Sequence, residues 1–515
     1  MKKQRIVALL ASAMMVVSAL SGCGQQEVVN ESTQQNENKE SVQQSQATES
    51  SQEEVVNLYE EEVNLVYVLP QVQETVPGLE AVQDALNEIT KEKINATIEF
   101  QLIPLNEYTD KMNMKFTAGE EFDLCFTGAW NPYLPAVTKG AYAELTEEVL
   151  NTYAPEYMAQ LNPAAWDAVT VNGKIYGAPI EQIYVRNSGV YMDVELAKKY
   201  DYDYSSVSKL EDLTSYFLEV RENEKPEDVT PYWLDGDDWA NFVGYWDYDP
   251  IVNNNVPGVV YASKDTPVVV NQFKSEEFKE YCQLLREWYE AGIVSEGSAI
   301  GDGYGLIQAA SSNPAVKPGG DVTQSQAVGR EVKSAQMGNA AMTTSAINAT
   351  VTAVSATSEN VERSVAFINL LNTDKEVLNL ICHGIEGVDY TFVDEANGVI
   401  QSTGNYPGFY SFFIGCVFNE YYTDPTMIGT WEETAAINAA AKGSCLLGFV
   451  FDSEPVSAEI SQCSAIAAEY LPPLTTGTVE PDAYLDEFLQ KLDAAGAEKI
   501  ITEMQSQIDA WVATK

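Results

Sequence analysis

The chain has 515 residues, of which 45% are hydrophobic, so it is long enough for two domains with apolar cores. Its 77 acidic residues outnumber 29 basic ones, and the net charge is −48. Such a charge repels phosphate backbones and anionic lipid headgroups, which argues against nucleic acid as a partner. Acidity of this kind keeps an exposed protein soluble and does not identify a ligand.

The first 23 residues have the order of a bacterial export signal. Lys2, Lys3 and Arg5 precede an apolar stretch, residues 6–20, that is too short for a comfortable transmembrane helix. Leu20-Ser21-Gly22-Cys23 follows at once and resembles a lipobox, in which the cysteine becomes the diacylated first residue after cleavage. We therefore predict a lipoprotein signal peptide at 1–22 and lipidation of Cys23. The alternative is an ordinary signal peptide with an incidental cysteine.

The segment that follows is low in complexity. Residues 24–57 consist almost wholly of Gln, Glu, Ser, Asn, Thr and Val, without an aromatic residue. Such a composition cannot bury enough surface to offset the entropy of ordering. We predict a lipidated, disordered tether over 23–57, which holds a globular body at a membrane surface.

The body begins with alternating strand and helix patterns. Their predicted order is strand 63–69, helix 79–89, strand 97–103, helix 108–116 and strand 122–126. This alternation predicts a parallel α/β sheet. Parallel sheets bind ligands beyond the carboxyl ends of their strands, which singles out residues 127–130, including Trp130.

Later segments add a hairpin and several helices. Residues 169–176 predict a hairpin, with Asn172-Gly173 supplying the positive φ angles of its turn. Ser208 with Glu211, and Thr373 with Glu376, have the spacing of capping boxes that open helices. Further helices are expected at 276–291, where Gly292 is the stop, and over the C-terminal residues 485–492 and 500–511.

Several of these segments together resemble a known family. Residues 171–179 (VNGKIYGAP) are similar to its "dGKiYGlP" hairpin, residues 123–130 to a strand end that closes on Trp, and residues 384–390 (GIEGVDY) to its "GiEGxhY" motif. The family is that of extracellular solute-binding proteins, family 1, of ABC importers. Residues 448–452, Cys463 and residues 492–507 resemble its DUF3502-containing lipoproteins.

The resemblance implies an α/β, two-lobed fold of the periplasmic-binding-protein type (type II), with a multi-strand hinge and a central cleft that closes on ligand. On this basis we expect residues 58–180 with about 306–350 to form one lobe. Residues 181–305 with about 351–515 are expected to form the other.

Aromatic and planar polar side chains are the groups that a sugar cleft needs. The candidate ligand contacts are Trp130, Tyr184, Arg186, Asp237, Trp239, Trp246, Glu386 and Tyr390. The alternatives are core packing for the aromatic residues and a structural salt bridge for Arg186. Tyr406, Phe409 and Tyr410 are assigned to packing rather than to ligand contact.

Catalytic and metal-binding patterns are not found in the sequence. The chain has one histidine, His383, and no Gly-x-Ser-x-Gly motif or Cys-x-x-Cys pair. Asp235-Gly236-Asp237-Asp238 does not have the alternating ligands of a calcium loop. We expect no enzyme, no cofactor and no metal. The six cysteines beyond Cys23 lie in apolar segments and are expected to be buried thiols rather than disulfides.

The predicted function is capture of a carbohydrate, an oligosaccharide above all, for an ABC importer. The expected partners are this solute, the permease subunits and a membrane reached through the lipid anchor, and we expect a monomer on the extracytoplasmic face. Binding of a peptide or polyol, a glycan-acting enzyme and a sensor lipoprotein stay open as alternatives.

Overall fold

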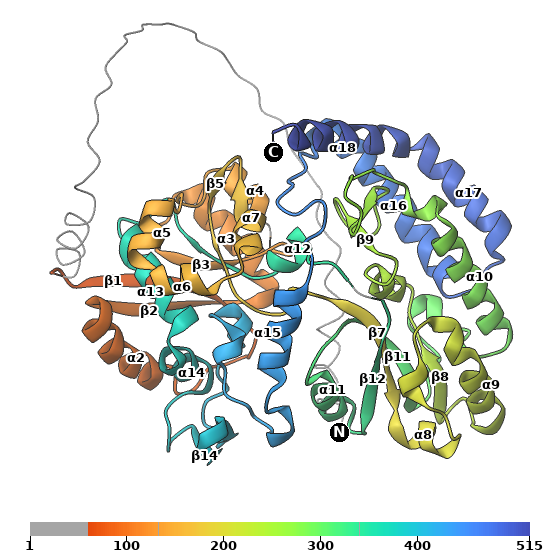
Figure 1. Cartoon of the computed structure of the whole chain (residues 1–515), viewed down its shortest axis with the longest axis horizontal. Coiled ribbons are helices and arrows are strands. Elements are labelled where there is room, and N and C mark those ends of the chain that lie inside the picture. The colour runs from red at the N-terminus through yellow and green to blue at the C-terminus, as the bar shows by residue number, and fades with distance from the viewer. Residues whose placement is uncertain (1–59, 132, 339, 515) are drawn as a thin grey trace, which may run out of the picture.

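The computed structural model describes residues 60–131, 133–338 and 340–514, which form two lobes side by side (Figure 1). The predicted signal peptide, lipidation site and tether lie outside the described residues. Each lobe is built around its own sheet and its own cluster of buried apolar side chains. The prediction of a two-lobed α/β fold is therefore confirmed.

The sheet of lobe 1 has the strand order β2-β1-β3-β13-β6. β1, β2 and β3 run parallel, and β13 lies antiparallel to both β3 and β6. β3 is buried along its whole length, as expected for a strand in the middle of a sheet covered on both faces. The elements of lobe 1 are β1 (Val63–Gln71), α2 (Leu79–Ile94), β2 (Ala96–Pro104), α3 (Leu105–Ala118), β3 (Leu124–Thr127), α4 (Tyr133–Thr138), α5 (Glu147–Tyr153), α6 (Pro155–Gln160), α7 (Pro163–Val169), β4 (Thr170–Val171), β5 (Lys174–Ile175), β6 (Ala178–Pro179), α12 (Thr344–Ile347), β13 (Val351–Val354), α13 (Val361–Thr373), α14 (Lys375–His383), β14 (Tyr390–Asp394), β15 (Val399–Ser402) and α15 (Thr430–Ala440).

The sheet of lobe 2 has the order β12-β7-β11-β8, in which β11 pairs antiparallel with β7 and parallel with β8. Three C-terminal helices pack on this lobe and contribute to its core. The elements of lobe 2 are β7 (Asn187–Asp193), α8 (Val194–Lys199), α9 (Thr214–Asn223), β8 (Val229–Trp233), β9 (Tyr248–Pro250), β10 (Val259–Tyr261), α10 (Glu276–Glu290), β11 (Ile307–Val316), α11 (Gly320–Val328), β12 (Val332–Gln336), α16 (Ser457–Thr475), α17 (Pro481–Ala494) and α18 (Ala497–Val512).

Strand pairing corrects the predicted division of the chain between lobes. Residues 306–350 were expected in lobe 1, but β11 and β12 pair with β7 of lobe 2. Residues 351–441 were expected in lobe 2, but β13 pairs with β3, and the segment that follows it packs on the core of lobe 1. The reason is that strands of either sheet have the same local pattern, so only pairing assigns them.

Three segments join the lobes: residues 180–187 between β6 and β7, the connection from β12 to β13, and the connection from α15 to α16. Backbone hydrogen bonds hold the second and third together, because Met342 N donates to Lys442 O (2.9 Å) and Ser444 N donates to Met342 O (2.8 Å). The first segment is bonded to α15, where the Asn438 side chain accepts from Tyr184 N and donates to Gln182 O.

Local expectations were met at the hairpin and corrected at the two capping boxes. Asn172 and Gly173 have φ angles of 53° and 76°, as the predicted turn requires. At the first box, Asp212 and not Glu211 accepts the backbone N–H groups of residues 208 and 209. At the second, Asp374 caps α14, and Thr373 belongs to the end of α13. Adjacent residues offer equivalent carboxylates and hydroxyls, so spacing alone does not decide between them.

The cysteines carry no disulfide within the described part of the chain. Five of the six are buried thiols, as predicted, and Cys445 is half-buried. Burial raises the pKa of the Cys125 thiol to about 12, so this side chain stays protonated and unreactive. No helix among the described residues has both the length and the apolar character to span a bilayer.

The loop after β15 depends on a glycine, and this dependence can be tested. Gly408 has a φ of 68°, and a Cβ there would lie 1.8 Å from the carbonyl oxygen of Cys382. Gly404, in the same loop, has a φ of 84° and no atom within 4 Å of that position. Both substitutions by alanine incur backbone strain, but only Gly408→Ala adds a clash. We expect Gly408→Ala to lower the free energy of unfolding by roughly 1–3 kcal/mol more than Gly404→Ala, measured by urea denaturation. Equal losses would contradict this close approach.

Candidate functional site

The carboxyl end of β3 closes in a tight turn against the second lobe-joining segment. Ala129 N donates to Asn348 O at 2.6 Å, and Trp130 Nε1 donates to Ala349 O at 2.7 Å. A Cβ on Gly128 would lie 2.3 Å from Ala349 O, so only glycine permits this approach. The turn thus holds the Trp130 ring at the strand end, where 41% of its surface stays exposed.

Trp130 belongs to an aromatic group that combines two distant parts of the chain. Its ring lies 5.4 Å from Phe126 and 6.3 Å from Phe413. Beyond Phe413, the rings of Phe412 and Tyr410 stack at 5.3 Å with 10° between their planes. We call Trp130, Tyr410, Phe412 and Phe413 the aromatic platform. Tyr410 is 45% exposed, so the platform offers two ring surfaces to solvent.

The sequence analysis assigned Tyr410 to packing, together with Tyr406 and Phe409. The structure buries Tyr406 and Phe409 but leaves Tyr410 exposed beside the other rings of the platform. A run of three aromatic residues within 410–413 was the available signal. Nothing in the sequence, however, places this loop beside the end of β3.

The first lobe-joining segment adds polar groups next to the same turn. Gln182 Nε2 donates to Thr350 Oγ1 at 2.6 Å, one residue beyond the carbonyl that holds Trp130. Arg186 lies further along this segment, and its side chain is exposed. Desolvation by the surrounding protein nevertheless lowers the pKa of its guanidinium.

Four of the predicted contact residues are buried in packing, which corrects their assignment. Tyr184 is fully buried, and its hydroxyl donates to Ile180 O at 3.2 Å. Trp239 packs between Phe273 and Phe278 in the core of lobe 2. The rings of Phe242, Tyr248 and Tyr281 cover Trp246. The rings of Phe392 and Tyr421 cover Tyr390. These side chains carry stability rather than a ligand surface.

Asp237 and Glu386 are exposed, but they lie in different parts of the molecule. Asp237 belongs to a turn of lobe 2 that packs on α16, where Thr475 Oγ1 donates to Gly236 O at 3.1 Å. Glu386 precedes β14, which pairs with β15 in a hairpin at the lower edge of lobe 1 in Figure 1. No contact joins either residue to the aromatic platform within the described chain. Of the eight predicted contacts, Trp130 and Arg186 lie exposed at the junction of the lobes, and Tyr184 lies buried in the same segment as Arg186.

The acidic turn around Asp237 contains a carboxyl group with an unusual titration. Burial, together with the charge of Asp235, raises the pKa of Asp238 to about 7. Asp238 accepts hydrogen bonds from Asp235 N and Asn241 Nδ2, both at 2.9 Å. Among the residues that the structure covers, no three or more His, Cys, Asp or Glu side chains are grouped as metal ligands.

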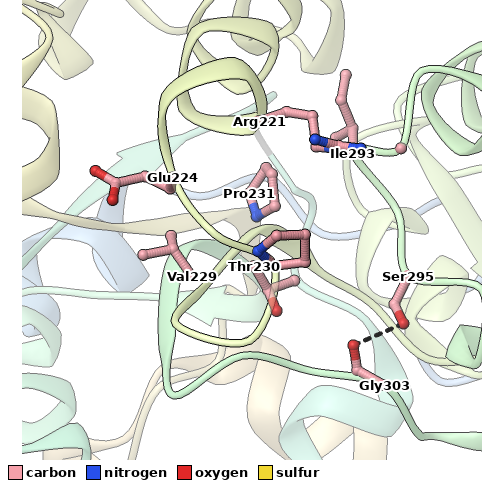
Figure 2. A pocket seen from close by; sticks show the side chains of 10 residues that line it. Arg221, Glu224, Val229, Thr230, Pro231, Ile293, Ser295 and Gly303 are labelled. Carbon is pink, nitrogen blue, oxygen red and sulfur yellow. Dashed lines mark hydrogen bonds between the residues drawn. The ribbon is translucent and has the colours of Figure 1, made fainter.

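A separate small pocket lies on lobe 2, between the end of α9, the start of β8 and residues 292–303 (Figure 2). Ser295 Oγ donates to Gly303 O at 2.8 Å on one side of it, and Arg221 lies on the other. Its cavity volume of ≈ 40 Å³ is far below the roughly 300–1,000 Å³ of small-molecule sites. We therefore do not place the ligand there.

Known proteins share this architecture over most of the chain. A family model, the domain of unknown function DUF3502, matches residues 445–513. A carbohydrate ABC transporter substrate-binding protein of Streptococcus pneumoniae serotype 4 (strain ATCC BAA-334 / TIGR4) is 29% identical over 444 residues, 83% of this chain and 87% of the relative. The crystal structure of an N-glycan transport solute binding protein (NgtS) from Streptococcus pneumoniae is 26% identical, with a TM-score of 0.77 over 88% of this chain and 99% of that chain.

The chain is similar to these solute-binding proteins along most of its length, and its last part matches DUF3502. The residues matched by DUF3502 begin in the third lobe-joining segment and continue through α16, α17 and α18. Their first residues contact both lobes, because Gly448 N donates to Thr344 Oγ1 at 3.0 Å and Cys445 N donates to Ala262 O at 3.1 Å. This domain thus connects the lobes as well as completing the core of lobe 2.

The raised pKa of Asp238 predicts a pH dependence of stability. The folded carboxyl binds its proton more tightly than the unfolded one, so the free energy of unfolding falls as pH rises from about 4 to about 7. Asp238→Asn removes this loss. The difference in the free energy of unfolding between pH 5 and pH 8 should therefore be smaller in this variant by roughly 2 kcal/mol. Chemical denaturation at both pH values measures it. Asp203→Asn is the control, because the pKa of Asp203 is lowered by Ser205 and this group is ionised throughout that range.

Proposed function

We propose that this protein captures an oligosaccharide between its two lobes and delivers it to an ABC importer. The observation that carries the proposal is the exposed aromatic platform at the carboxyl end of β3, beside the three lobe-joining segments. Sugars present apolar C–H faces that stack on such rings, and their hydroxyls bond to planar polar groups such as the Gln182 amide. The platform lies on lobe 1, so closure would bring lobe 2 over a ligand stacked there.

The similar proteins support a sugar as the ligand and a role in transport. NgtS is described in complex with Man1GlcNAc and with Man5GlcNAc, and the curated relative is a carbohydrate ABC transporter substrate-binding protein. The TM-score against NgtS is 0.77, but it is 0.68 and 0.64 for these two complexes at the same 26% identity. Such a decrease is expected if the lobes rearrange about their joining segments when sugar binds.

The same proposal includes the setting of the protein. Cys23 would carry the lipid anchor and residues 24–57 the tether, so that a monomer works on the extracytoplasmic face beside its permease subunits. The protein would act by binding alone, as the similar solute-binding proteins are named, and not as an enzyme.

Capture of a sugar can be tested by measuring the melting temperature of the protein with and without ligand. Man5GlcNAc and related oligosaccharides should raise the melting temperature, and the increase should grow with concentration, because a ligand that binds only the folded state stabilises it by mass action. If a peptide or polyol stabilised the protein and no glycan did, the assignment of a sugar as the ligand would be wrong, but the proposal of solute capture would stand. Release of a shortened glycan during the assay would instead identify an enzyme.

The role of the aromatic platform can be tested by two substitutions of one ring. Trp130→Ala removes the stacking surface and should weaken glycan binding by at least about 1 kcal/mol, or about fivefold. Trp130→Phe retains a ring but loses the hydrogen bond to Ala349 O, so it should bind more tightly than the alanine variant. Isothermal titration calorimetry on the folded variants measures both. An unchanged affinity in Trp130→Ala would remove this residue from the site.

A further inference from the structure

Two cations lie opposite each other where the sheet of lobe 2 meets the first lobe-joining segment. Val316, the last residue of β11, pairs with Asn187, the first residue of β7, in an antiparallel register. Continuing this register by one residue places Lys317 opposite Arg186. Residues directly opposite in an antiparallel pair have Cβ atoms roughly 4.5–5.5 Å apart, and like charges there repel each other.

Neither cation has a partner within the described chain. No carboxylate lies within 4.0 Å of the Arg186 guanidinium or the Lys317 ammonium, and neither side chain donates a hydrogen bond. Other cations, such as Arg221, also have no ion pair among the described residues, but Arg186 and Lys317 are both desolvated by the surrounding protein. A desolvated charge is costly unless it is paired.

The electrostatics agree with this geometry. Desolvation lowers the pKa of Lys317, Glu420 raises it, and the Arg186 charge lowers it further. Glu420 is engaged elsewhere, because it accepts from Ser411 Oγ at 2.6 Å and its other oxygen lies 3.4 Å from His383 Nε2. The two cations are therefore close enough to interact, and at Lys317 the attraction of Glu420 exceeds the repulsion by Arg186 without offsetting the desolvation.

Both cations also lie at the junction of the lobes. Arg186 follows Gln182, whose amide bonds to the segment behind Trp130. Lys317 opens the turn before α11, and Gly319 in that turn approaches Met427 and Thr430 of lobe 1. Figure 1 shows α11 and α15 in the middle of the molecule, between the two sheets. A ligand enclosed between the lobes would meet these two side chains as well as the aromatic platform.

We propose that Arg186 and Lys317 bind a carboxylate on the sugar, so that the natural ligand is an acidic oligosaccharide. This inference rests on the function proposed above and specifies its ligand. The planar guanidinium matches a carboxylate with two parallel hydrogen bonds, and the ammonium adds a second positive charge. The bound carboxylate relieves the repulsion between the two cations. Ligand binding then supplies the counterion that the chain does not.

The test compares three probes that differ at one group. They are an N-glycan ending in sialic acid, its methyl ester, in which only the carboxylate charge is removed, and the glycan without sialic acid. Calorimetric titration of the full chain should give an affinity for the acid about tenfold above that for the ester. Higher salt should reduce this preference, because it screens the attraction.

Substitutions test whether the two cations cause the preference for the acid over the ester. Arg186→Gln and Lys317→Gln should each lose most of the preference for the acid and keep the affinity for the ester. Each should also melt at the same temperature as the unmodified protein or higher without ligand, since a repulsion is removed; a structural role for Arg186 would lower it. Arg221→Gln, an exposed arginine at the small pocket of lobe 2, is the matched control and should keep the preference.

The outcomes separate this inference from the function on which it rests. Equal affinity for acid and ester, or a full preference in Arg186→Gln and Lys317→Gln, would overturn the acidic ligand while the neutral glycan still bound. Binding of none of the three glycans would overturn the proposed function together with it.

Discussion

The antiparallel pairing of β13 with β3 is the interaction on which the site depends. It returns the chain from lobe 2 to the middle of the sheet of lobe 1, with Val351 opposite Thr127. Because β13 is fixed there, the residues just before it lie against the turn at the end of β3. Their carbonyl groups hold Ala129 and Trp130, and Thr350 accepts from Gln182. One segment thus joins the lobes and supports the aromatic platform.

This arrangement connects the aromatic platform to the lobe-joining segments by direct hydrogen bonds. The three lobe-joining segments are hydrogen-bonded to one another and to α15, so they form a connected unit rather than three independent linkers. A sugar that touches both the aromatic platform and lobe 2 would stabilise the closed arrangement only through contacts that the open one lacks. Arg186 and Lys317 belong to lobe 2 and its joining segment, so they are placed to make such contacts.

Arg186 and Lys317 differ from the other cations in their surroundings. Some cations are paired: Arg330 Nη2 lies 2.9 Å from Glu195 and Lys333 lies 3.3 Å from Asp321. Others, such as Arg221, have no ion pair among the described residues, but Arg186 and Lys317 are desolvated and lie at the junction of the lobes. The anionic ligand that we propose would supply a counterion at this place.

Part of the site could be predicted from sequence and part could not. Trp130 was singled out because an apolar strand followed by a turn marks the ligand-facing edge of a parallel sheet. Trp239 and Trp246 were assigned to a cleft wall because acidic residues surround them, but aromatic side chains within residues 242–281 bury both rings. Tyr410 and Lys317 could not be proposed from sequence, because Trp130 and Arg186, to which the structure relates them, lie more than a hundred residues away. The same limit caused the error in the lobe boundaries at β11 and β13.

The sequence by itself determined the local elements, from the alternation of the strands around residues 63–126 to the Asn172-Gly173 turn, because hydrophobic period and turn chemistry are properties of neighbouring residues. Motif order along the chain was enough to indicate a two-lobed solute-binding protein. Only the tertiary structure decided which strands share a sheet, which aromatic rings remain exposed, and that Arg186 lies opposite Lys317. These depend on pairing between distant segments, whose energy comes from contacts that no local pattern encodes.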